Sequence, residues 1–198
     1  MKSVTKILSR VFPMDSKIPE AVLENARKRG SAVHEWIEAY NKYLVDGGEE
    51  PTINFEYLIY ADSYKKWVKE YQVKPKHTEL KLSDDGVVGI IDMICETKDD
   101  PEIVVDFKIT YDYNLPYVEL QTSAYKHLGV ANKVVSPNVP QALLHISKTG
   151  FNYVKLNDEY EKFKLIKELD DYIDRRSKEK KWFPIFNFNC KGGIVCLF

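Results

Sequence analysis

Two long segments near the start of the chain repeat hydrophobic residues at helical spacing. From Pro19 to about Leu44, apolar side chains recur every three or four positions, and "DGGEEP" (46–51) ends the pattern. A second segment, from about Phe55 to Tyr71, carries an apolar stripe rich in aromatic residues. Both segments are predicted to be amphipathic helices.

In the middle of the chain, the helical spacing of hydrophobic residues gives way to an alternation of hydrophobic and polar residues. "HTELKLS" (77–83) alternates, "DDG" (84–86) is typical of a hairpin turn, and "VVGIIDMICE" (87–96) is the predicted partner strand. A further turn precedes "IVVDFKIT" (103–110), which is rich in β-branched residues. Three consecutive strands joined by short turns predict an antiparallel meander.

The remaining elements complete an α/β pattern. We expect a helix over 115–128, strands over 141–147 and 151–156, and a charged amphipathic helix ending near residue 182. The basic opening "MKSVTKILSRVFPMD" is interpreted as the first element of the fold. This order of helices and strands indicates an α/β sandwich that forms a single domain over 1–198, with its core at about 19–182.

Composition limits the possible partners and compartments. The chain has 198 residues, 44% hydrophobic and 30% charged, with a net charge of -1, which suits one soluble domain without general attraction to nucleic acid or membrane. No apolar run is long enough to span a bilayer. Cys95, Cys190 and Cys196 form no disulfide framework, which favours a reducing compartment. We expect the cytoplasm, with the mitochondrial matrix as an alternative because the opening is similar to a transit peptide.

Charged residues interrupt two of the predicted strands. Asp106 and Lys108 lie two positions apart, so they share one face of the third meander strand. By the same alternation, Asp92 is expected on the face of Ile90 and Ile94 in the preceding strand. The hairpin then brings Asp92 and Asp106 onto neighbouring strands.

Two interpretations of these charges are open. Two carboxylates brought close together repel each other unless a divalent cation binds between them, and Glu79 on the first meander strand could add a third oxygen ligand. The simpler interpretation is a buried ion pair between Asp106 and Lys108 beside a hydrogen-bonded Asp92.

The motifs together resemble the PD-(D/E)XK nuclease superfamily. "GIID" is followed fourteen residues after its Asp by "DFK", which is similar to the superfamily's metal-binding Asp and its Asp-x-Lys strand. "GSAVHEW" (30–36) and "QTSAY" (121–125) resemble the helical His and Gln-xxx-Tyr of the RecB-type subgroup. The N-terminal segments also resemble phage-type and mitochondrial-maintenance-type exonucleases of that group. The resemblance runs from about residue 3 to 182, and it implies a restriction-endonuclease-like α/β/α core, in which helices flank a mixed sheet with an antiparallel three-strand meander.

The resemblance implies a role for each matching residue. His34, Asp92, Asp106 and the backbone carbonyl of Phe107 would ligate Mg²⁺ or Mn²⁺, with Glu79 as a possible ligand of a second ion. Lys108 would orient or deprotonate the attacking water, and Gln121 and Tyr125 would support the site. Iron–sulfur relatives use four cysteines, whereas this chain has three, so no cluster is expected.

The implied activity is hydrolysis of DNA phosphodiester bonds. Arg27, Lys28 and Arg29 precede His34 and are candidates for nucleic-acid binding. We expect a DNA exonuclease that acts on single-stranded or duplex ends in phage recombination or DNA repair. The alternatives are a structure-specific or restriction-type endonuclease, and a catalytically inactive DNA-binding module.

Overall fold

The computed structural model of the chain describes residues 1–13 and 18–179. Its elements are β1 (Lys2–Ser3), α1 (Val4–Leu8), α2 (Glu20–Asp46), the short 3-10 helix η1 (Phe55–Tyr57), α3 (Leu58–Tyr71), β2 (Lys74–Asp84), β3 (Val87–Glu96), β4 (Ile103–Lys108), α4 (Leu115–Ala131), β5 (Gln141–Ser147), β6 (Gly150–Lys155) and α5 (Tyr160–Glu179). Within the described part of the chain, no helix is long and apolar enough to cross a membrane.

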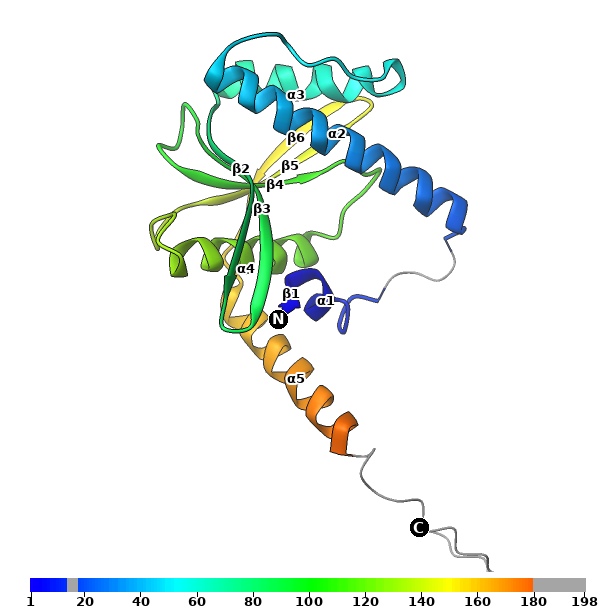
Figure 1. Cartoon of the computed structure of the whole chain (residues 1–198), viewed down its shortest axis with the longest axis vertical. Helices are drawn as coiled ribbons and strands as arrows, with labels where there is room; N and C mark the ends of the chain where they lie inside the picture. The colour runs from blue at the N-terminus through cyan, green and yellow to red at the C-terminus, as the bar shows by residue number, and fades with distance from the viewer. Residues whose placement is uncertain (14–17, 180–198) are drawn as a thin grey trace, which may run out of the picture.

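The strands form one mixed sheet flanked by helices. The order is β1-β3-β4-β5-β6, with β2 also paired to β3. β2, β3 and β4 are antiparallel, as the sequence predicts, whereas β1 pairs with β3 and β4 with β5 in parallel. Figure 1 shows α2 and α3 on one side of the sheet and α4 on the other. The predicted α/β class, the meander and the flanking helices are therefore confirmed.

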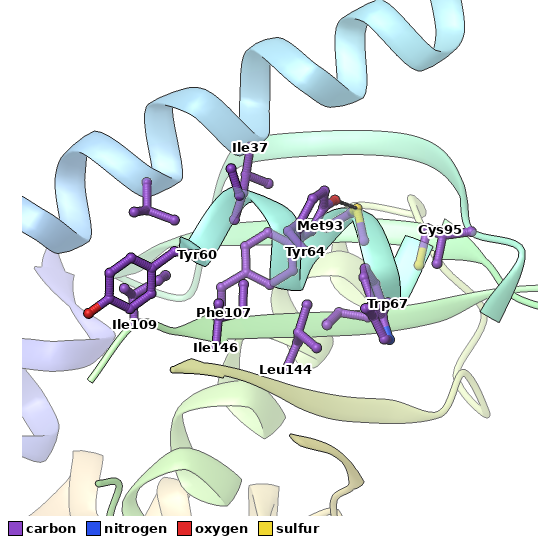
Figure 2. Packing of buried hydrophobic residues seen from close by; sticks show 14 of the residues in the cluster. Ile37, Tyr60, Tyr64, Trp67, Met93, Cys95, Phe107, Ile109, Leu144 and Ile146 are labelled. Atoms are coloured by element: carbon purple, nitrogen blue, oxygen red, sulfur yellow. Dashed lines mark hydrogen bonds between the residues drawn. The ribbon is translucent and has the colours of Figure 1, made fainter. Parts of the chain in front are cut away.

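Each face of the sheet buries its own hydrophobic core. The first core joins α2 and α3 to the sheet around Tyr64, Trp67 and Phe107, all at most 2% exposed (Figure 2). The second core joins α1, α4 and α5 to the opposite face around Ile91, Leu128 and others. Large aromatic side chains in the first core bury much apolar surface, which fixes α2 against the sheet.

The element boundaries follow local signals in the sequence. Asn114 caps α4 by accepting a hydrogen bond from the N–H of Tyr117 at 3.1 Å, and Pro116 occupies its first turn. Gly86, at φ +75°, provides the left-handed conformation that the β2–β3 turn requires. The predicted end of the last helix near residue 182, together with Cys190 and Cys196, lies outside the described residues. Cys95 is buried in the first core.

Candidate metal and nucleic-acid site

A gap in the sheet lies along one edge of β3. β2 and β1 both pair with Val87 and Val88 of β3. Two strands cannot occupy the same edge, so β1 lies along the edge of β3 opposite to β2. β4 uses that opposite edge only from Met93 onward, where Met93 pairs with Val105. Among the described strands, residues 89–92 therefore have no partner on this edge. We refer to this unpaired stretch of the β3 edge, between the β1 and β4 pairings, as the notch.

Asp92 lies at the inner end of this notch. Its Oδ2 accepts a hydrogen bond of 2.7 Å from the N–H of Phe107, so a side chain replaces the next backbone pairing between β3 and β4. In an extended strand the N–H and carbonyl of one residue point to the same neighbour. The carbonyl of Phe107 is therefore directed toward the notch as well.

In the β2–β3 hairpin, the regular alternation of side chains between the two faces of the sheet is broken near Glu79 and Asp92. Glu79 has a φ of +50°, which is rare for a residue with a side chain, and it forms no ladder pair with Asp92. The expectation that Asp92 shares a face with both Ile90 and Ile94 is wrong: Ile94 is buried in the second core, whereas Ile90 is 43% exposed and lines the cleft on the α2 side. The left-handed residue breaks the simple alternation.

The turn at Glu79 brings three ligand-type side chains together. One ligand atom each from His34, Glu79 and Asp92 lies within 4.8 Å of the others. Nδ1 of His34 lies 3.4 Å from Oε1 of Glu79. α2 holds His34 at this position because its buried Asn41 accepts a 2.6 Å hydrogen bond from Tyr64 and lies against Thr78 of β2.

Asp106 and Lys108 approach the same cleft from the α4 side of the sheet. Asp106 is 2% exposed, and its Oδ2 lies 2.5 Å from Nζ of Lys108. That contact is an ion pair without hydrogen-bond geometry, and Oδ2 has no hydrogen-bond partner among the described residues. The ion pair of the simpler interpretation is thus present, but it leaves a buried carboxylate oxygen without a directed donor.

Two residues of α4 extend this arrangement. Lys108 donates a 2.9 Å hydrogen bond to Oε1 of Gln121, and Nε2 of Gln121 donates one of 2.9 Å to the hydroxyl of Tyr125. The structure therefore joins the three residues into one chain of hydrogen bonds. The (i, i+4) spacing that places Gln121 and Tyr125 on one helical face was the signal in the sequence.

Gly89 is a supporting residue that the sequence analysis did not identify. A Cβ at this position would lie 2.7 Å from two ring atoms of Tyr125 and 2.9 Å from Leu128. Only glycine lets the Tyr125 ring lie directly on β3. The signal was available, because Gly89 opens the "GIID" motif inside a strand where glycine otherwise weakens packing.

The charges in the cleft strongly affect one another. Burial, followed by the nearby charge of Asp106, raises the pKa of Asp92 to about 7. Burial lowers the pKa of Lys108, but the carboxylates of Asp106 and Asp92 outweigh that effect and raise it overall, so the ammonium keeps its proton. Burial also lowers the pKa of His34, and the hydrogen bond with Glu79 and the charge of Asp92 reverse the shift. The cleft thus concentrates negative charge that a cation would stabilise.

The cleft itself has a volume of about 990 Å³. It is lined by residues from α2, β2, β3, β4 and α4, including His34, Glu79, Asp92, Asp106 and Lys108. All of the predicted metal and catalytic residues, Phe107 included, line this one cleft.

The three consecutive basic residues do not form one patch. Successive residues of a helix point about 100° apart, and the contacts follow that geometry. Arg27 lines the cleft and pairs with Glu20 at 2.8 Å, whereas Lys28 pairs with Glu24 at 2.8 Å on the exposed surface. Arg29 lies 5.9 Å from the centre of the Tyr60 ring, in a second cavity.

Gly30 lines the cleft one turn before His34. Beyond its chain neighbours and the backbone of its own helix, no described atom lies within 4 Å of the position that its Cβ would occupy. The glycine is therefore not explained by the close approach of another element, and it leaves open space facing the cleft.

Comparison with known proteins gives no family for this chain. No protein-family model matches the sequence, and no curated protein matches it. Among solved structures, the crystal structure of SSO0001 is similar over 97% of this chain and 95% of that chain, with 13% identity and a TM-score of 0.37. A TM-score of this size does not establish a shared fold.

Proposed function

We propose that this chain is a metal-dependent deoxyribonuclease with a PD-(D/E)XK-type core. The observation that carries the proposal is the convergence of His34, Glu79 and Asp92 in one cleft with the Asp106–Lys108 pair. Stability of the fold does not require three ligand-type groups within 4.8 Å of one another beside a buried carboxylate and a buried ammonium. Clusters of interacting charged groups in a cleft are typical of functional sites. Structural ion pairs alone do not account for the repulsion between Asp92 and Asp106.

The residues present fit a hard divalent cation. Asp106 offers a buried oxygen whose one partner among the described residues is the Lys108 ammonium, and Asp92 and Glu79 offer further carboxylate oxygens. Oxygen donors suit Mg²⁺ and Mn²⁺, and the imidazole of His34 favours Mn²⁺. His34, Asp92, Asp106 and the carbonyl of Phe107 would hold the ion, with Glu79 available to a second one. When bound, such an ion lowers the pKa of water and neutralises charge on a phosphate.

The other residues of the cleft position the reacting groups. Lys108 keeps its proton on Nζ in the metal-free protein and can donate hydrogen bonds to a water molecule or to a phosphate oxygen. Its hydrogen bond to Gln121, which Tyr125 supports, limits the directions in which Nζ can point. A fixed donor of this kind stabilises charge that develops during phosphodiester cleavage.

An exonuclease agrees best with the small charge of the chain. At a net charge of -1, the long-range attraction for an unbroken duplex is weak. A free end can enter the cleft, where metal ions and a few cationic side chains supply the affinity. We therefore propose action on DNA ends, in recombination or repair, with an endonuclease of the same fold as the alternative.

The deciding experiment uses end-labelled single-stranded and duplex DNA with Mg²⁺, Mn²⁺ or EDTA. We expect cleavage with either metal and none with EDTA. A covalently closed single-stranded circle, compared with its linear form, should resist degradation. Equal degradation of the circle would identify an endonuclease, and the absence of cleavage with every metal would identify an inactive DNA-binding module.

A further inference from the structure

A second cavity adjoins the cleft at the end of β4. It has a volume of about 960 Å³ and lies among α2, α3, the segment after β4 and the β5–β6 hairpin. Thr110 lines both cavities, and the consecutive residues Arg29 and Gly30 line one cavity each. The two cavities are therefore adjacent, as a strand that occupies both of them requires.

The walls of this second cavity are suited to phosphate groups. Arg29 lies over the face of Tyr60, and its Nε is buried without a hydrogen-bond partner among the described residues. Figure 2 shows Tyr60 at the edge of the first core, with its hydroxyl pointing away from the other labelled side chains. Lys148 adds an exposed ammonium from the turn between β5 and β6, and Asp112 is the one carboxylate among the described lining residues.

Aromatic and hydrogen-bonding groups complete the cavity. Tyr111 is 98% exposed, so its ring contributes almost nothing to the core and is available to stack on a flat ligand. Nε2 of His145 lies 2.8 Å from the carbonyl oxygen of Thr110. Because that oxygen can only accept, Nε2 carries the proton, and the His145 ring, which lines the cavity, also makes an edge contact with the ring of Tyr113.

We infer that the second cavity binds the nucleotides of an unpaired DNA strand next to those held in the cleft. Arg29 and Lys148 contact phosphates, and Tyr111 stacks on a base. Cations combined with an accessible aromatic ring are the usual means of holding single strands without sequence preference. This inference rests on the proposed nuclease function for its choice of ligand, and it adds the path that the strand follows.

The test measures binding separately from cleavage. The affinity of a fluorescein-labelled oligothymidylate of about ten nucleotides is measured by fluorescence polarisation in EDTA, so that no metal chemistry takes part. Tyr111→Ala should weaken binding by about 5- to 100-fold, the loss of one stacked base, whereas Tyr111→Phe should stay within about twofold. Tyr172→Ala, which alters a tyrosine 52% exposed on α5, is the matched control and should have no effect.

A second variant tests the phosphate contact. Lys148→Gln should reduce the slope of log affinity against log salt by about 0.7, the value for one phosphate contact on a single strand. Lys66→Gln, at an exposed position on α3, should leave the slope unchanged.

The outcomes separate this inference from the nuclease proposal. If wild-type protein does not bind the oligonucleotide, or if Tyr111→Ala and Lys148→Gln bind as tightly as wild type, the second cavity is not a strand-binding site, whether or not the protein cleaves DNA. If both variants lose affinity while wild type fails to cleave with any metal, the strand site stands and the nuclease proposal falls.

Discussion

Asp92 and Phe107 are joined across β3 and β4 by a side chain where a backbone pair would otherwise form. The 2.7 Å hydrogen bond from the N–H of Phe107 to Oδ2 of Asp92 ends the ladder that begins at Cys95 and Ile103. The contact holds one oxygen of Asp92 beside the cleft. The same residue that offers a ligand oxygen therefore also takes the place of a backbone pairing at this point of the sheet.

Neutralising Asp92 should stabilise the metal-free protein. In the unfolded chain Asp92 loses its proton near pH 4, but in the fold its pKa is about 7, so the folded state binds the extra proton between these values. Stability attributable to Asp92 therefore falls as the pH rises from about 4 to about 7. Asp92→Asn keeps an acceptor for Phe107 and should gain ~1–2 kcal/mol at pH 8, discounted for partial exposure.

Thermal unfolding in EDTA at pH 4 and pH 8 measures that effect. The gain should appear at pH 8 and vanish at pH 4. Mn²⁺ should raise the Tm of wild type and leave that of Asp92→Asn nearly unchanged. A variant less stable than wild type at pH 8 would contradict the charge repulsion inferred for the cleft.

Replacing Lys108 should separate catalysis from binding. Lys108→Met keeps most of the aliphatic stem but removes the ammonium that contacts Asp106 and Gln121. Cleavage of linear single-stranded DNA should fall by roughly 10²- to 10⁴-fold, while the Mn²⁺-induced rise in Tm remains. Lys66→Met, on an exposed face of α3, is the control. Activity within a few-fold of wild type would show that Lys108 serves only as the structural ion-pair partner of Asp106.

Gly30→Ala should stabilise the fold and impair the cleft. Alanine in a helix is more stable than glycine by about 1 kcal/mol, and no described atom obstructs the new methyl group. If a DNA strand passes close to α2, the KM for single-stranded DNA should rise several-fold with kcat little changed. An unchanged KM in the stabilised variant would show that the strand does not approach Gly30.

Gly89→Ala should have the opposite effect on stability. The new Cβ would lie 2.7 Å from the ring of Tyr125, so the ring must move and α4 must shift. Overpacking of this kind costs about 1–3 kcal/mol, and displacement of Tyr125 also disturbs the hydrogen bond to Gln121. Chemical denaturation and cleavage rates should both decline. Wild-type stability would show that the Tyr125 ring relaxes without loss.

Asp170 should make the stability depend on pH in the acid range. Burial raises the pKa of Asp170, but the hydrogen bonds of 2.5 Å from Lys2 and from Arg10 outweigh burial, so the net pKa lies below the usual value. The stabilisation is therefore complete above about pH 4 and disappears as the pH falls through the folded-state pKa. Asp170→Asn should lower the Tm by several degrees at pH 7 and by progressively less below pH 4. A constant difference across that range would exclude the charge interaction.

Local patterns in the sequence determined the elements of this protein. Apolar periodicity predicted α2 and α3, and alternation with the "DDG" turn predicted the β2–β3 hairpin, because each signal depends on residues close together in the chain. The same alternation placed Asp106 and Lys108 on one face, where the structure has them. The hairpin then required Asp92 and Asp106 to lie on adjacent strands.

Long-range packing decided how those elements form the cleft. The left-handed Glu79 turns β2 and β3 so that Ile90 and Ile94 face opposite sides, and no local pattern predicts a positive φ at a glutamate. His34 contacts Glu79, which lies 45 positions later in the sequence, because packing in the first core holds α2 against the β2–β3 hairpin. The sequence alone thus supplied the chemical groups and their strands, whereas burial of α2 and α4 against opposite faces of one sheet brought those groups to a common space.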